Sequence, residues 1–155
     1  LSKAVGFGNA HGLTHAVKKP KGWKNLGTYN RYQAEEFGRF VQKLKDTPEP
    51  TGNGNMLDNT FAMHGSASSS FHLSRNYPII SAGGGNLGFR NGRYLKFGEG
   101  NEDNQAGAGI VSDVGWRGEI EAEEKPLALL LVTALQRLGV ETESFAGVTG
   151  ILDRV

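Results

Sequence analysis

The sequence contains no cysteine among its 155 residues. This absence excludes disulfide bonds, zinc–thiolate sites, iron–sulfur clusters and catalysis by a thiol nucleophile. Long apolar runs are missing too, because no stretch of the chain approaches the roughly 18 consecutive apolar residues that a transmembrane helix needs. We therefore expect no membrane span.

A strong excess of one sign of charge is also lacking, since the net charge is only +1. Its distribution is nevertheless uneven: residues 1–50 carry a net +5, residues 51–97 a net +3 and residues 98–155 a net −7. A nucleic-acid-binding domain is usually basic throughout, so we expect no nucleic-acid partner. The lysines at positions 18–24 could grip phosphates, but a solvated loop before a helix explains them better.

Hydrophobic periodicity predicts the regular elements. Spacings of three and four predict helices over residues 26–45 and 126–138, and Gly139 can supply a left-handed cap after the second helix. Short apolar runs predict strands at residues 60–65 and 77–82, and alternation after a turn predicts a third strand at residues 93–97. This order of elements indicates a layered α/β fold.

Two segments are predicted to lie outside the regular elements. Residues 6–24 are rich in glycine and polar side chains and are expected to form a loop. Residues 98–124 carry eight acidic residues against one arginine and are expected to form a long glycine-rich polar insert. We expect residues 1–155 to be either a single α/β domain or the carboxyl-terminal fragment of a larger one.

A glycine pattern typical of dinucleotide binding follows the second predicted strand. Gly83, Gly85 and Gly88 match the GxGxxG spacing, but that pattern binds a pyrophosphate only where a helix begins in the loop. The turn signal Asn91-Gly92 follows instead. We therefore predict that the glycines allow a sharp turn or a close backbone approach, and that no nucleotide cofactor binds there.

Four histidines are the candidate ligands of a metal ion. His11 and His15 would face the same way on a helical turn, and neutral imidazole is a common ligand of zinc and related ions. His64 and His72 fall at the carboxyl end of the first predicted strand, where ligands gather in open α/β sheets. A core histidine with a satisfied hydrogen bond explains His64 equally well. The serine run at residues 66–70 has no nucleophile elbow, which disfavours a serine triad.

An ordered series of segments resembles one bacterial family over nearly the whole chain except the acidic insert. The matching segments are His11 to Ala16, Asn30 to Tyr32, Leu44 to Glu49, Leu57 to Thr60, Gly65 and Ser66, His72, Asn76 to Pro78, Ala82 to Gly85, Gly92 to Leu95, Pro126 and Leu127, Leu135 to Glu141, Glu143 to Phe145, and Thr149 and Gly150. This family is the HXXSHH family, an exported group similar to the alkaline phosphatase and sulfatase superfamily of metal-dependent hydrolases.

The resemblance implies an α/β fold with part of an alkaline-phosphatase-like layered sheet, flanking helices and a long polar insert. It also implies that the chain matches the carboxyl-terminal part of longer family members, and that His11, His15 and His72 are the candidate metal ligands. The catalytic residues stay unknown, because the nucleophile of the superfamily lies in the amino-terminal portion. An exported, periplasmic location follows from the resemblance as well.

The chain departs from the family pattern where metal ligands would be needed. Ala16 stands in place of the final histidine of the motif, and Thr14 in place of its serine. The loop at residues 67–74 is shortened, and residues 146–148 replace a segment that usually contains an aspartate. A two-metal hydrolase needs carboxylates together with imidazoles to neutralise its ions and activate water.

Two functions from different classes follow from this pattern. In the favoured one, the chain is a non-catalytic structural or accessory subunit that keeps a hydrolase fold and binds other polypeptides of a larger complex. In the alternative, it is the carboxyl-terminal part of an exported phosphate- or sulfate-ester hydrolase, with Arg75 or Arg93 binding the anion. These residues do not establish a cofactor. They offer candidate ligands only for a divalent metal ion.

Overall fold

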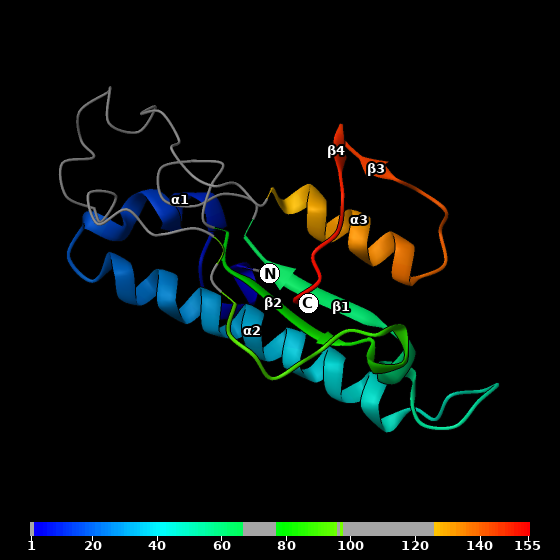
Figure 1. Cartoon of the computed structure of the whole chain (residues 1–155). Helices are drawn as coiled ribbons and strands as arrows, with labels where there is room; N and C mark the ends of the chain where they lie inside the picture. Colours follow the sequence, from blue (N-terminus) through cyan, green and yellow to red (C-terminus); the bar gives the residue numbers. More distant parts are fainter. Residues whose placement is uncertain (1, 67–76, 96, 98–125) are drawn as a thin grey trace. The chain divides into compact units, whose positions relative to one another are not determined.

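The computed structural model describes residues 2–66, 77–95, 97 and 126–155. The chain divides into two compact units, Leu1–Met56 and Leu57–Val155. The described residues form a mixed α/β structure with three α-helices and two small two-stranded antiparallel sheets (Figure 1). None of the helices in the described ranges is both long enough and apolar enough to cross a bilayer. The acidic insert and the serine run after Ser66 lie outside the described residues.

The first unit is helical. The 3₁₀ helix η1 (Ser2–Val5) precedes α1 (Ala10–His15), and η2 (Ala16–Lys18) leads into the long helix α2 (Gly22–Asp46). The predicted helix at residues 26–45 is confirmed, although it begins four residues earlier. The prediction of a loop over residues 6–24 is wrong at α1.

Local capping explains why α1 forms within this glycine-rich stretch. The Asn9 side chain accepts a hydrogen bond from the His11 backbone N–H at 3.0 Å, which satisfies one donor at the start of the helix. The Thr14 hydroxyl donates to the carbonyl of His11 at 2.7 Å. A cap and one side-chain bond thus compensate for a short helix whose composition is typical of a loop.

A tight corner joins η2 to α2. Lys21 takes a left-handed conformation, with φ of 63°, immediately before the helix begins. A Cβ added at Gly22 would lie 1.7 Å from the carbonyl oxygen of Ala16, so only glycine fits this position. Gly22 is also the buried residue of α2, whereas Phe40 on its apolar face is 51% exposed.

A two-stranded antiparallel sheet opens the second unit after η3 (Met56–Asn59). Strands β1 (Phe61–Gly65) and β2 (Ile79–Gly83) confirm the strands predicted at residues 60–65 and 77–82 to within two residues at any end. They pair with Phe61 opposite Gly83 and Gly65 opposite Ile79. The carboxyl end of β1 therefore meets the amino end of β2. In the described residues no layered parallel sheet is present, so the argument that placed a ligand site at parallel strand ends does not apply.

The third strand, predicted at residues 93–97, is wrong: the described residues 93–95 and 97 form no strand. Hydrogen bonds from side chains connect this segment to the rest of the second unit instead. Asn91 donates from Nδ2 to the carbonyl of Gly83 at 3.0 Å, and the Arg93 guanidinium donates to the carbonyl of Arg154. Tyr94 is 90% exposed, so the alternation that predicted a half-buried strand does not correspond to a buried face.

The core of the second unit is centred on α3 (Leu127–Arg137), which confirms the predicted helix at residues 126–138. Gly139 has a φ of 82° and provides the predicted left-handed cap. Leu129, Leu130 and Leu152 form a buried cluster. The partly buried residues packed against this cluster are Phe61, Ile79, Leu127, Val148 and Val155.

A short hairpin that the sequence reasoning did not anticipate follows α3. Strands β3 (Ser144–Phe145) and β4 (Val148–Thr149) pair antiparallel and contact α3 (Figure 1). The two turn residues, Ala146 and Gly147, both have positive φ, as a two-residue type I′ hairpin requires. Alanine is uncommon in such a turn, which is why the local signal is weak.

Candidate functional site

His11 and His15 lie side by side on α1. Their Nε2 atoms are 2.9 Å apart, their ring centroids are 4.6 Å apart and their ring planes meet at 67°. Both residues are exposed. The expectation that the four-residue spacing places both imidazoles on one face of a helical turn is therefore confirmed, and their outer nitrogens converge on one point.

The structure does not bring the three predicted histidine ligands together within the described residues. His72 lies outside the described residues, so its place beside His11 and His15 stays a prediction. Within the described ranges there is no group of three or more histidine, aspartate or glutamate side chains that could hold a metal ion. His64 lies in the second unit, half-buried on β1 and opposite Ile80.

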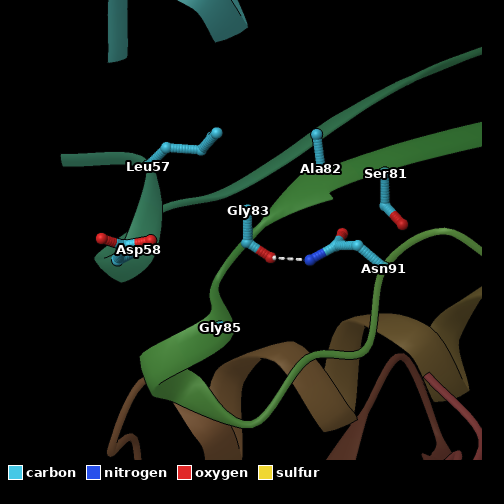
Figure 2. A pocket seen from close by; sticks show the side chains of 7 residues that line it. All are labelled: Leu57, Asp58, Ser81, Ala82, Gly83, Gly85 and Asn91. Atoms are coloured by element: carbon cyan, nitrogen blue, oxygen red, sulfur yellow. Dashed lines mark hydrogen bonds between the residues drawn. The ribbon is translucent and has the colours of Figure 1, made fainter. Parts of the chain in front are cut away.

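A shallow pocket of about 300 Å³ lies at the end of β2 in the second unit. In Figure 2, Leu57 and Asp58 of η3 lie on one side, and Ser81 of β2 and Asn91 lie on the other. The wall between them is completed by Ala82, Gly83 and Gly85. The lining of this pocket is mostly apolar, and Asp58, Ser81 and Asn91 are its polar members.

The pocket residues were not identified as a site from the sequence. Asp58, Ser81 and Asn91 are separated along the chain, and no spacing rule joins them. Asn91 was recognised only as part of a turn signal, whereas its Nδ2 atom also holds the carbonyl of Gly83 at the pocket wall (Figure 2). This bond joins residues eight positions apart, and no turn pattern in the sequence encodes it.

Close packing explains the glycine run beside the pocket. Gly83 and Gly84 have φ values of 81° and 69°. An added Cβ would lie 2.3 Å from the carbonyl oxygen of Thr60 at the first position and 2.6 Å from Cδ2 of Phe89 at the second. The element that follows, η5 (Gly85–Leu87), is a three-residue 3₁₀ helix. The α-helix that a dinucleotide fingerprint requires does not begin there.

Two arginines were considered as anion ligands. Arg75 lies outside the described residues. Arg93 donates to the carbonyl of Arg154, so this side chain makes a tertiary contact within the second unit. Arg137, in the last turn of α3, donates from Nη1 to the carbonyls of Gly88 at 2.9 Å and Val155 at 2.7 Å.

Comparisons with known proteins add no family assignment: no family model, curated protein or solved structure matches this chain.

Proposed function

We propose that this chain is a non-catalytic structural or accessory subunit of a larger assembly of polypeptides, derived from the metal-dependent hydrolase fold of the HXXSHH family. The proposal includes an exported, periplasmic location. It also includes an alkaline-phosphatase-like layered sheet, in which β1 and β2 are completed by strands of other polypeptides. A ribbon of two strands is only marginally stable in water by itself, so further strands or a packed layer would stabilise it.

The observation that carries this proposal is the exposure of two aromatic side chains on the long helix. Trp23 is 64% exposed and Phe40 is 51% exposed, although α2 has the spacing of a helix that packs along one face. Apolar surface left in water contributes nothing to stability, whereas its burial gains about 25 cal/mol per Å². A partner that covers this face would recover that free energy, as expected of a subunit in a permanent complex.

Residues on the opposite side of α2 support the same interpretation. Arg31 pairs with Glu35 at 2.7 Å, and Gln42 donates to Asp46 at 2.8 Å. Such pairs at a spacing of four residues stabilise a solvated helix surface. The helix thus has one face suited to solvent and one face suited to a protein partner.

Cross-linking of the native complex tests the assembly. We expect lysines of α2, such as Lys43 and Lys45, to cross-link to one stoichiometric partner, and we expect Phe40→Glu to abolish those cross-links. Gln42→Glu places the same side chain on the far side of the helix and should preserve them. Retention of the cross-links by both variants, or a native mass of 16.7 kDa, would contradict the proposal.

The alternative function has one specific observation in its favour, the convergence of His11 and His15. In that proposal the chain is the carboxyl-terminal part of a phosphate- or sulfate-ester hydrolase, with His11, His15 and His72 as ligands of a divalent metal ion. Turnover of aryl phosphate or aryl sulfate esters by the native protein, lost in His15→Ala, would favour the hydrolase. Turnover unchanged in the variant would remove His15 from such a site.

A further inference from the structure

The two imidazoles on α1 lie close enough for both Nε2 atoms to bind one metal ion. Two nitrogens bound to one ion at about 2.05 Å lie roughly 2.9 Å apart when the angle at the metal is 90°, and about 3.3 Å apart when it is tetrahedral. The observed distance between the Nε2 atoms of His11 and His15 is 2.9 Å. It corresponds to two adjacent positions of a square-planar or octahedral ion.

We infer that His11 and His15 form a two-imidazole chelate for one Cu²⁺ ion, with both Nε2 atoms in adjacent equatorial positions. Square-planar or tetragonal coordination by nitrogen and oxygen is typical of Cu²⁺, and Ni²⁺ is the next ion expected to bind. Divalent Cu also leads the affinity order of first-row ions at a given nitrogen site. The remaining positions are taken by water, because both rings are exposed.

The local structure of α1 supports chelation by orienting both rings in advance. The Asn9 cap and the bond from the Thr14 hydroxyl to the His11 carbonyl hold the one helical turn that brings the nitrogens together. Once one imidazole has bound the ion, the second binds in an intramolecular step with a high effective concentration. The 2.9 Å contact is a hydrogen bond in which one Nε2–H donates to the other Nε2. When the ion binds, it takes the place of this proton, and each ring binds through Nε2 as a neutral imidazole with its proton on Nδ1.

This site is independent of the proposed accessory function and differs from the hydrolase site. The hydrolase set requires His72 as a third ligand, whereas the chelate uses two side chains of a single helix. A subunit without catalytic activity can carry it. The site therefore predicts a different ion preference and a different pattern of sensitive residues from those of the hydrolase alternative.

Titration of the full chain with CuCl₂, NiCl₂ and ZnCl₂ at pH 7.5 tests the inference. We expect one Cu²⁺ per chain, affinities in the order Cu²⁺, Ni²⁺, Zn²⁺, and nitrogen hyperfine structure from two imidazoles in the electron paramagnetic resonance spectrum. His11→Ala and His15→Ala should each weaken Cu²⁺ binding by about tenfold or more, because a chelate becomes a single ligand. Binding should also weaken at pH 5.5, where imidazoles take up protons.

Control variants at other histidines show whether the loss of Cu²⁺ binding is specific to His11 and His15. His64→Ala and His72→Ala should leave the Cu²⁺ affinity unchanged, and far-UV circular dichroism should show that His15→Gln, a second variant at the site, keeps the helical content. Equal Cu²⁺ affinity in wild type, His11→Ala and His15→Ala would overturn the chelate. Zn²⁺ bound more tightly than Cu²⁺, with loss of binding in His72→Ala, would overturn it in favour of the three-histidine site. Failure of the cross-linking experiment would leave the chelate unaffected.

Discussion

The guanidinium carbon of Arg137 lies 4.6 Å from the centroid of the Phe89 ring. Phe89 in turn stacks on Phe61, with centroids 4.0 Å apart and ring planes 13° from parallel. Burial lowers the pKa of Arg137, and the nearby positive charge of Arg90 lowers it further, but a guanidinium stays protonated in proteins. One cation on α3 thus binds the aromatic pair through the ring of Phe89.

Arg137→Met should destabilise the second unit by about 2 kcal/mol, because it removes the two charged hydrogen bonds to the carbonyls of Gly88 and Val155 and the contact with Phe89. Urea unfolding of the full chain, followed by far-UV circular dichroism, measures this loss. Arg154→Met is the control: its side chain is exposed, and its carbonyl can still accept from Arg93. Equal stability of the two variants would show that the Arg137 contacts contribute little.

Thr133→Val should cost about 1–3 kcal/mol, although it preserves the size of the side chain. Thr133 is 3% exposed; its hydroxyl donates to the carbonyl of Leu129 and accepts from the N–H of Leu152, both at 2.8 Å. Valine would leave that buried N–H without its partner. Hydrogen exchange at the Leu152 amide should accelerate in Thr133→Val and change less in Thr133→Ser, which keeps the hydroxyl. Similar exchange in both variants would contradict this role.

Gly84→Ala and Gly88→Ala separate backbone strain from steric overlap. Both glycines have positive φ, so alanine at either position should cost about 1–2 kcal/mol. At Gly84 the new Cβ would also meet the Phe89 ring at 2.6 Å, whereas at Gly88 nothing lies within 4 Å. Overpacking adds about 1–3 kcal/mol, so Gly84→Ala should be the more destabilised in thermal unfolding. The reverse order would refute the close approach to Phe89.

Gly22→Ala and Gly27→Ala form a similar pair in α2. The first should disrupt the corner before α2, because its Cβ would overlap the Ala16 carbonyl, and helical content should fall. The second faces open space inside the helix and should stabilise it by about 0.5–1 kcal/mol. Circular dichroism during urea unfolding tests both. If Gly22→Ala kept the helicity of wild type, the corner would not depend on glycine.

The pair between Glu36 and Arg39 predicts a pH dependence on α2. The Arg39 guanidinium donates a hydrogen bond to the Glu36 carboxylate and lowers the pKa of Glu36 below its ordinary value of 4.5. Because the folded state binds this proton less readily, the stabilisation is present above pH 4.5 and is lost as the pH falls through the lowered pKa. Carbon-13 titration should show the Glu36 pKa rising in Arg39→Gln.

The local spacing of apolar residues was enough to locate the two longest helices, α2 and α3. The helix at residues 126–138 was predicted because its leucines, Pro126 and Gly139 all agree on one structure, and α3 occupies nearly the same residues. The four-residue spacing of His11 and His15 indicated that both imidazoles would share one face if the segment were helical, although a loop was predicted there. By contrast, α1 itself was missed, because a cap on Asn9 stabilises a segment whose composition is typical of a loop.

The sequence by itself determined the approximate limits of α2, α3, β1 and β2, and the glycine positions that require left-handed backbone conformations. These properties depend on neighbours a few residues away. Only the tertiary structure decided that β1 and β2 run antiparallel, that residues 93–95 and 97 form no strand, and that Arg137 binds two distant carbonyls. Such contacts join residues up to 61 positions apart, as in the bond from Arg93 to the Arg154 carbonyl, and their energies depend on packing that no local spacing encodes.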